Sequence, residues 1–278
     1  MAKKILYPFL LLFCLTCNHS VPQKGLLVII GGRKKPAEAV RSFIDHCNGG
    51  KILVIPSASA VPLESGPEAA QLFRDHGANN VDWIFILDKE MASADSVVQM
   101  IRESQGIFFT GGVQTRLMDR IGGTPAEDAI HELYFKRGGV VGGTSAGAAV
   151  MSQIMITGDG DFNILERDNI VTEKGLGLVN HCIIDQHFIR RSRNNRLLSL
   201  VIEKNMIGVG IDESTAVLYY PNDTFRVVGQ GSVLIYDPRG SHTQNISGKG
   251  KLAIGSLKLS VLYHGLWFDL NKGRIVHE

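Results

Sequence analysis

The sequence predicts an α/β protein built on a mostly parallel, doubly wound sheet. Through its first half, short continuous apolar runs bounded by Gly or Pro alternate with amphipathic runs of helical period. Apolar runs without polar alternation are typical of strands buried on both faces, and strand–helix–strand alternation predicts a parallel sheet. With 278 residues, 44% of them hydrophobic, the chain is long enough to bury one large core. We therefore expect one domain over residues 21–278.

The parallel part of the sheet is expected to contain five strands with helices between them. The expected strands are residues 26–30, 52–55, 81–87, 107–109 and 139–142. The expected helices are residues 36–47, 66–76, 92–104 and 115–136, the last with a break near residues 122–125. Thr124 followed by Pro125 is a plausible N-cap with proline at the first helical position, so a new helix is expected to begin there.

The C-terminal part has a different pattern. Short strand-like runs are separated by Asn-Asp, Gly-Gln-Gly and Pro-Arg-Gly turns, and they occupy residues 209–211, 216–220, 225–228, 232–236 and 257–262. Since no linker precedes them, they are expected to form an antiparallel extension of the same domain.

The N-terminus has the features of an export signal. A basic start, Met1-Ala2-Lys3-Lys4, precedes an apolar run over residues 5–15 that is too short to span a bilayer. Residues 1–20 are therefore expected to be a signal peptide, and the protein to be exported to the cell envelope or secreted. Cys17 follows the apolar run and resembles the lipidated cysteine of bacterial lipoproteins, which would attach the protein to a membrane. An ordinary secretory signal and an uncleaved anchor are the alternatives.

Charge and cysteine content exclude several other classes. The formal net charge is +2, and no basic run with interleaved aromatic residues favours a nucleic-acid partner. Besides Cys17, the mature chain contains Cys47 and Cys182, with no C-x-x-C pair or His-rich cluster that would indicate a metal site. Both cysteines are expected to be small buried hydrophobic residues, and whether they pair is left open.

Gly143-x-Ser145-x-Gly147 has the spacing of a nucleophile elbow. It follows a short apolar strand and precedes a helix of small residues. A serine on such a sharp turn needs small neighbours, and the helix start offers free N–H groups to a developing oxyanion. The alternative is a Gly-rich turn whose serine only caps a helix.

Other glycine-rich segments are expected to lie at the same edge of the sheet, because ligands of such sheets bind beyond the carboxyl ends of the strands. Gly31-Gly32 follows the first strand, and residues 110–114 follow the fourth. Gly31-Gly32-Arg33 lacks the G-x-G-x-x-G pattern. No nicotinamide, flavin or other cofactor is therefore expected.

A nucleophilic serine needs a base and an acid that orients it. His187 lies where an apolar strand ends, and Asp212 and Glu213 follow the next strand. The chain order serine, histidine, acid differs from that of α/β-hydrolases and is the order of flavodoxin-like amidotransferase relatives.

Four motifs in this order resemble cyanophycinase and the S51 serine peptidases, from about Gly25 to the last strands. They are Gly143-Thr144-Ser145-Ala146-Gly147-Ala148, Phe109-Thr110-Gly111-Gly112-x-Gln114, Asp185-Gln186-His187-Phe188-x-x-Arg191-x-Arg193-x-x-Arg196-Leu197 and Gly210-Ile211-Asp212-Glu213-x-Thr215-Ala216. The resemblance implies a three-layer α/β/α sandwich with a flavodoxin- or amidotransferase-like sheet, and a homodimer. At one position the chain departs from the family, because Val113 stands where the family usually has aspartate.

The resemblance also implies roles for individual residues. Ser145 would be the nucleophile, His187 its base and Glu213 the orienting acid, while Gly112 and Ala146 would supply the N–H groups of an oxyanion hole. The residues that match the family's substrate pocket are Gln114, Asp185, Gln186, Arg191, Arg193 and Arg196. Family members cut cyanophycin into β-aspartyl-arginine dipeptides or cut aspartyl dipeptides.

The sequence thus predicts an exported, metal-free serine exopeptidase that acts on cyanophycin-like or aspartyl-rich peptides. Closely spaced arginines after the presumed base suit carboxylate groups of such a substrate. A non-catalytic surface binder of acidic peptides and a small-amide or ester hydrolase on the same fold are the alternatives.

Overall fold

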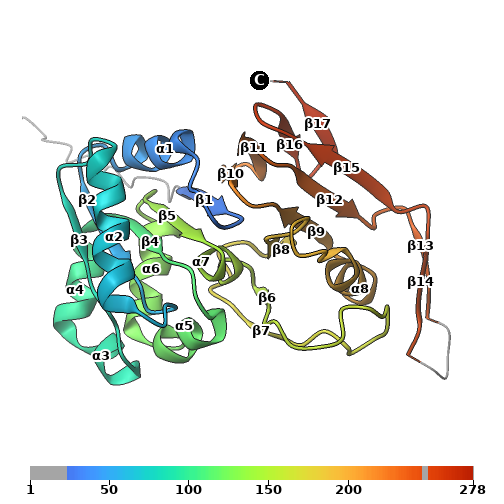
Figure 1. Ribbon diagram of the computed structural model, residues 1–278, viewed down its shortest axis with the longest axis horizontal. Helices are drawn as coiled ribbons and strands as arrows, with labels where there is room; N and C mark the ends of the chain where they lie inside the picture. The colour runs from blue at the N-terminus through green and yellow to red at the C-terminus, as the bar shows by residue number, and fades with distance from the viewer. Residues whose placement is uncertain (1–23, 246–249, 278) are drawn as a thin grey trace, which may run out of the picture.

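The computed structural model describes residues 24–245 and 250–277. Its main sheet has nine strands in the order β17-β16-β11-β10-β1-β5-β4-β2-β3 (Figure 1). The parallel strands are β1 (Leu26–Ile30), β2 (Lys51–Ile55), β3 (Val81–Trp83), β4 (Ser104–Phe109) and β5 (Val140–Thr144). The predicted α/β class with a mostly parallel central sheet is confirmed.

Helices cover both faces of the parallel strands and make the three layers. The helices of one face are α1 (Ala37–Cys47) and α2 (Pro62–Asp75). Those of the other are α3 (Lys89–Ser93), α4 (Asp95–Glu103), α5 (Gln114–Ile121) and α6 (Pro125–Phe135). Alternate residues of β1 enter the two cores: Leu27 and Ile29 pack on the α4–α6 face, and Val28 packs on the α1–α2 face. Such double burial explains why the strand sequences show no polar alternation.

Several predicted elements differ from the structure at their boundaries: α2 begins at Pro62 rather than Gly66, and β4 begins at Ser104 rather than Ile107. The strand expected over residues 81–87 ends at Trp83, because its partner β2 ends at Ile55 and is followed by Pro56, which has no N–H to donate. The helix expected over residues 92–104 is two helices, since Ala94 is extended between α3 and α4. Thr124 stands at the N-cap of α6 as expected, but its hydroxyl donates to Ile121 O rather than accepting from the helix.

The C-terminal strands are divided between two sheets. The strands β10 (Thr215–Tyr219), β11 (Thr224–Gly229), β16 (Trp267–Asp269) and β17 (Arg274–Val276) extend the main sheet in antiparallel fashion. A separate four-stranded sheet contains β8 (Cys182–Gln186), β9 (Ile207–Ile211), β12 (Val233–Asp237) and β15 (Lys258–Leu262). The strands predicted at residues 209–211, 232–236 and 257–262 lie in this second sheet, in which β12 pairs antiparallel with β9 and β15, and β9 pairs in parallel with β8.

The second sheet forms because β8 and β9 are parallel neighbours joined by the crossover helix α8 (Asn194–Lys204). In Figure 1 this sheet and α8 lie on the right, beside the layered α/β part on the left. One hydrophobic core contains residues of both sheets, among them Leu27 of β1, Ile184 of β8 and Val209 of β9. The carboxyl ends of β5, β8 and β9 therefore face a common region between the two sheets.

The remaining elements are short. The helix α7 (Ala146–Ala149) follows β5, and two hairpins are formed by β6 (Ile154–Ile156) with β7 (Thr172–Lys174) and by β13 (His242–Asn245) with β14 (Leu252–Gly255). Cys47 and Cys182 are both buried and unpaired, which settles the question that the sequence left open. The signal-peptide residues 1–20 and Cys17 lie outside the described residues. Within residues 24–245 and 250–277, no helix has the length and apolar character needed to cross a bilayer.

Candidate active site

Ser145 lies at a sharp turn between β5 and α7, with φ 54° and ψ −111°. Only residues with little or no side chain fit around it. A Cβ on Gly143 would lie 2.3 Å from Gly147 O, and a Cβ on Gly147 would lie 2.4 Å from Phe109 O. The Gly143-x-Ser145-x-Gly147 spacing is thus required by close packing of the backbone, and the serine occupies a strained conformation of the kind found at functional sites.

His187 joins Ser145 to Glu213. Its Nε2 lies 2.8 Å from Ser145 Oγ, and its Nδ1 lies 2.8 Å from Glu213 Oε1. The backbone N–H of His187 donates to Gly31 O at 2.8 Å, which ties the end of β8 to the end of β1. Gly32 leaves room for the imidazole, because a Cβ there would lie 2.2 Å from His187 Cε1. The Gly31-Gly32 segment thus serves to seat the histidine.

Asp212 and Glu213, the two acids that the sequence left as alternatives, have different partners. Glu213 contacts the histidine, whereas Asp212 Oδ1 accepts the backbone N–H of Arg190 at 3.0 Å. The second oxygen of Glu213, Oε2, forms a 2.8 Å ion pair with Arg33 Nε. The sequence analysis assigned no role to Arg33. Only its position directly after Gly31-Gly32, at the end of β1, could have placed it near the site.

The electrostatic environment keeps Glu213 ionised and His187 neutral. Burial alone would raise the pKa of Glu213, but the His187 hydrogen bond and the Arg33 charge outweigh it and hold that pKa below its usual value. Burial lowers the pKa of His187 below 6.5; the bond to Glu213 opposes this shift, and the charges of Arg191 and Arg193 add to it. A neutral imidazole beside a serine hydroxyl is suited to act as a proton acceptor.

The segment after β4 faces the serine. A Cβ on Gly111 would lie 3.5 Å from Ser145 Cβ, and the next residue, Gly112, has φ 143°. Within the described part of the chain, neither the Gly112 N–H nor the Ala146 N–H donates a hydrogen bond. Gln114 is buried, and its Nε2 donates to Ile156 O and to Thr157 O at 2.7 Å and 2.5 Å. Its amide nitrogen is thus engaged in holding the end of β6.

The polar residues around the end of β8 form a buried network. Arg196 is 1% exposed and pairs in bidentate fashion with Asp185, also 1% exposed, with Nε 2.7 Å from Oδ2. Gln186 Oε1 accepts from Arg193 and Arg196, and Arg193 also donates to Gln186 O at 2.6 Å. Arg191 is exposed, and its backbone N–H donates to His187 O at 3.0 Å. Of the three arginines, Arg191 is exposed, Arg193 is partly buried with a side chain 13% exposed, and Arg196 is buried.

Val113 stands at the N-cap of α5 and has no side chain that could cap the helix. Replacing it by aspartate, the residue that the family resemblance leads one to expect, should stabilise the protein by about 1 kcal/mol, since a carboxylate there accepts the free N–H groups of the first turn. Urea denaturation measures the difference as a raised midpoint. Val113→Leu is the control without a capping group, and equal midpoints for both variants would contradict the capping role.

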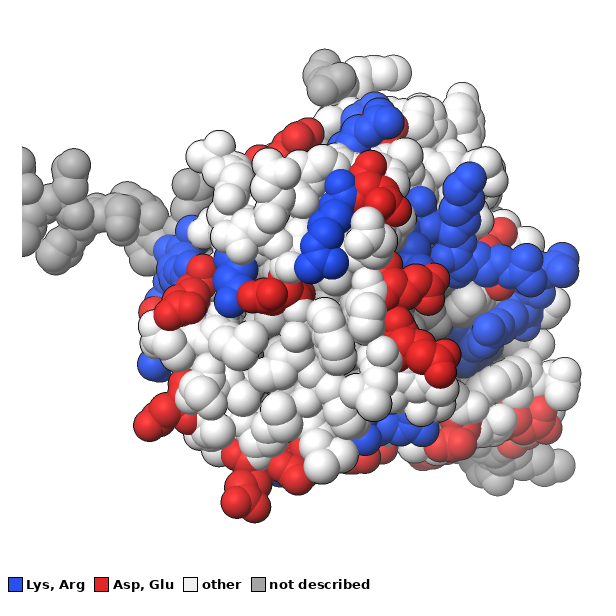
Figure 2. Space-filling model, turned by 60° about the vertical axis from the view of Figure 1, so that its left-hand side comes forward, with Lys and Arg blue, Asp and Glu red and all other residues white. Residues whose placement is uncertain are grey.

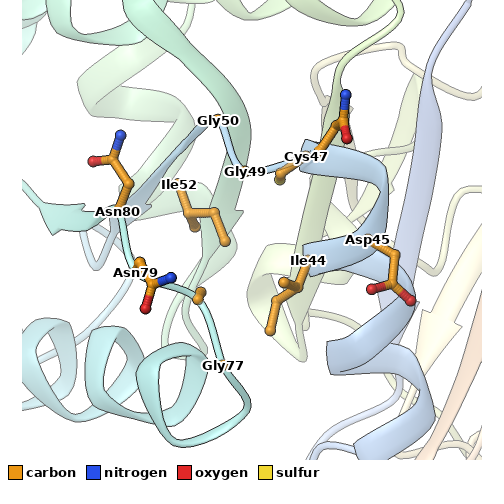
Figure 3. A pocket seen from close by; sticks show the side chains of 11 residues that line it. Ile44, Asp45, Cys47, Gly49, Gly50, Ile52, Gly77, Asn79 and Asn80 are labelled. Atoms are coloured by element: carbon orange, nitrogen blue, oxygen red, sulfur yellow. The ribbon is translucent and has the colours of Figure 1, made fainter.

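A cavity lies far from this site. It has a volume of about 350 Å³ and is lined by the end of α1, the start of β2 and the turn after α2 (Figure 3). These segments lie at the amino ends of the parallel strands, opposite Ser145. Cys47 is its one thiol, and burial raises the pKa of that thiol to about 12. The cysteine is thus protonated near neutral pH and unsuited to act as a nucleophile.

The charges visible on one face agree with the near-neutral balance of the chain. Figure 2 shows acidic and basic side chains next to one another, with broad uncharged areas between them. A field of a single sign, of the kind that attracts a polyanion, does not cover this face.

Comparison with known proteins assigns the chain to a family. The model of peptidase family S51 matches residues 26–228. Two cyanophycinases are each 34% identical to this chain. The one from Thermosynechococcus vestitus aligns over 95% of this chain and 84% of its own length, and the one from Nostoc over 89% and 86%.

Solved structures agree with this assignment. A peptidase from an acI-B1 actinobacterium aligns with TM-score 0.69 and 25% identity, over 89% of this chain and 97% of the neighbour. A putative peptidase E protein from Listeria monocytogenes shares the fold, with TM-score 0.55 and 17% identity over 75% of this chain and all of its own. The chain is a peptidase and belongs to peptidase family S51.

Proposed function

We propose that this peptidase is an exported serine exopeptidase that hydrolyses cyanophycin-like or aspartyl-containing peptides. The observation that carries the proposal is the continuous chain of hydrogen bonds from Ser145 through His187 to Glu213, with both distances 2.8 Å. It begins at a serine held with φ 54° at a strand-to-helix turn. A turn whose serine only caps a helix has no reason to present its hydroxyl to a buried imidazole.

The reaction uses each group of this chain in turn. Ser145 Oγ attacks the carbonyl carbon of the scissile bond while its proton passes to His187 Nε2. Glu213 accepts a hydrogen bond from the Nδ1–H of His187 and stabilises the imidazolium. The C–N bond then breaks, and His187 returns the proton to the leaving amine. Water repeats the sequence on the acyl-enzyme, so that a carboxylic acid leaves and Ser145 regains its proton.

The oxyanion formed at each step needs hydrogen-bond donors that are free beforehand. The backbone N–H groups of Gly112 and Ala146 suit this role, because they lie on either side of Ser145 in the two segments that meet there and donate to no acceptor in the described structure. Gly112 cannot easily carry a side chain, since a Cβ would lie 2.0 Å from Ala58 O.

Substrate preference is inferred from the relatives and from the charges around the site. The curated relatives are named cyanophycinases. Two exposed cationic side chains lie near the histidine and its acid: Arg33 pairs with Glu213 Oε2 at 2.8 Å, and the charge of Arg191 acts on His187. We assign direct contact with substrate carboxylates to Arg191, and we assign Asp185, Arg196 and Gln114 to positioning, because their charged or amide groups are buried and engaged with one another or with the backbone.

Product analysis tests this function. The purified protein is incubated with cyanophycin, a set of aspartyl peptides, and simple amides and esters, and the products are identified by mass spectrometry. Dipeptide release from cyanophycin, or cleavage confined to aspartyl peptides, supports the proposal. Turnover of simple esters or amides alone would favour the small-substrate hydrolase, and binding without any turnover would favour the surface binder.

Export, lipidation and assembly are part of the proposal. The basic start and apolar run of residues 1–15 support a signal peptide, and the position of Cys17 supports lipid attachment. Labelling of the expressed protein with radioactive palmitate should be lost in Cys17→Ala; retained label would contradict lipidation at this residue. We also propose a homodimer, by analogy with the family, and light scattering of the mature chain measures its mass.

The state of His187 predicts the pH dependence of the reaction. Since the base must be neutral and its pKa lies below 6.5, kcat/KM should rise with pH below 6.5 and be level at pH 7. Arg191→Gln removes a charge that lowers this pKa, so the rise should move to higher pH. The control is Arg102→Gln, whose side chain pairs with Glu132 on the surface at 3.7 Å. An unmoved profile in Arg191→Gln would contradict this electrostatic coupling.

A further inference from the structure

Residues 30–33, at the end of β1, bind all three strand ends that meet at the site. Their first three carbonyls accept, in chain order, the backbone N–H groups of Ser145, His187 and Ser214, at 3.0, 2.8 and 2.9 Å. Each carbonyl holds a different part of the site: the turn of the serine, the end of β8, and the turn after β9. The side chain of the fourth residue, Arg33, adds the ion pair with Glu213. One short segment is thus bound to every part of the site.

Arg33 occupies an uncommon backbone conformation. Its φ is 58°, and the preceding Gly32 has φ 124°. Positive φ favours glycine over residues with a Cβ, and where another residue is kept in it the strain often accompanies a functional site. The hydrogen bond from the Ser214 N–H to Gly32 O holds this turn against the one that carries Glu213. The arginine therefore starts beside the acid with which it pairs.

The two oxygens of Glu213 have separate partners. Oε1 lies 2.8 Å from His187 Nδ1, and Oε2 lies 2.8 Å from Arg33 Nε. The Glu213 side chain is 14% exposed and that of Arg33 65% exposed, so the pair lies where the site opens to solvent. The last torsion of a glutamate side chain is broad and only weakly restricted. Because a cation holds Oε2, the carboxylate cannot turn away from the imidazole without breaking the ion pair.

Other charged groups also face Glu213, but they act on it less directly. Burial alone would raise the pKa of Glu213, and the His187 hydrogen bond, the charge of Arg33 and, to a smaller extent, the charge of Arg190 lower it. The backbone N–H of Arg190 is bound by the neighbouring carboxylate, Asp212. Among the lysines and arginines that the structure describes, only Arg33 forms an ion pair with Glu213.

We infer that Arg33 is a positioning residue of the hydrolytic site: through Oε2 it keeps Glu213 ionised and turned toward His187, which in turn aligns the imidazole with Ser145. The inference rests on the proposed function, because it takes these three residues as the catalytic ones. It extends their chain of hydrogen bonds by a residue that lies outside the four sequence motifs. Arg33 acts through Glu213 and not through contact with the substrate.

The test measures labelling of Ser145 by a small uncharged fluorophosphonate, whose binding needs no cationic side chain. Arg33→Met keeps an aliphatic stem and removes the guanidinium. It should lower the maximal labelling rate about tenfold, because the imidazole is less well aligned. The probe concentration that gives half of this rate should not change. For dipeptide release from cyanophycin, kcat should likewise fall while KM stays the same.

The pH dependence of labelling gives a second readout. Without the cation, Glu213 and His187 take up protons more easily, so the rise of the rate with pH should move to higher pH in Arg33→Met. Arg33→Lys keeps the charge but not the planar fork. It should therefore keep the wild-type pH profile and regain part of the rate. A merely structural role of Arg33 would leave the profile in place in both variants.

The matched control is Arg226→Met, which breaks a 2.7 Å ion pair with Glu38 between β11 and α1. It should label at the wild-type rate. Wild-type labelling and an unmoved pH profile in Arg33→Met would overturn the inference alone. So would a change confined to KM for cyanophycin, which would make Arg33 a substrate contact. No labelling of the wild-type protein would overturn the proposed function as well.

Discussion

Ser145→Ala is expected to lower kcat/KM for release of dipeptides from cyanophycin by about 10⁴-fold or more. The substitution removes the atom that forms the acyl-enzyme and leaves His187 without a proton to accept. Binding and the N–H groups of Gly112 and Ala146 remain, so a small residual rate and a nearly unchanged KM are expected. Continuous assay of dipeptide release measures both constants.

The control for this variant is Ser93→Ala, which removes an exposed hydroxyl of α3 that donates to Lys89 O at 2.7 Å. It should retain full activity. Because Ser145 Oγ bonds only His187 in the described structure, Ser145→Ala should unfold at nearly the same urea concentration as the wild type. Activity within tenfold of the wild type would rule out Ser145 as the nucleophile.

The largest effect on stability is expected for Arg196→Met. This arginine pairs in bidentate fashion with Asp185, and both residues are 1% exposed. Its loss leaves a buried carboxylate whose remaining cation, Arg193, lies 3.6 Å away, and it removes one of the two donors to Gln186 Oε1. The free energy of unfolding should fall by about 3–5 kcal/mol. Urea denaturation measures it.

Two further variants identify the cause of this loss. The double variant Asp185→Leu with Arg196→Met removes both charges, so it should recover part of the stability. Arg102→Met breaks the exposed pair with Glu132 and should cost less than about 1 kcal/mol. If the double variant were less stable than Arg196→Met, the uncompensated charge of Asp185 could not be the reason. Since His187 directly follows this network, loss of stability should be accompanied by loss of activity.

Most of the fold was predictable because its strands carry their own signal. Residues 26–30 and 52–55 are apolar throughout, as strands between two helical layers must be, and Gly or Pro marks where they end. The assignment of β9, β12 and β15 to one sheet was not predictable in this way. Their sequences are compatible with either sheet, and the choice depends on the parallel pairing of β9 with β8 across α8.

The candidate site, too, was predictable from the sequence only in part. Ser145, His187 and Glu213 were identified as motif residues, and the structure brings their side chains within hydrogen-bond distance. The motif could not distinguish residues that face solvent from residues that are buried in the interior. Arg191 and Arg196 are both basic residues of one segment, yet one is exposed and the other is buried against Asp185.

The sequence by itself determined the class of fold, the strained serine turn and the identity of the residues at the strand ends, because these depend on local patterns and on small residues at fixed spacing. Only the tertiary structure decided that Arg33 pairs with Glu213, that Asp212 accepts the backbone N–H of Arg190, and that Gly31 and Gly32 lie against His187. Each of these contacts joins segments far apart in the chain. Their formation depends on how the sheets and helices pack, which no local pattern records.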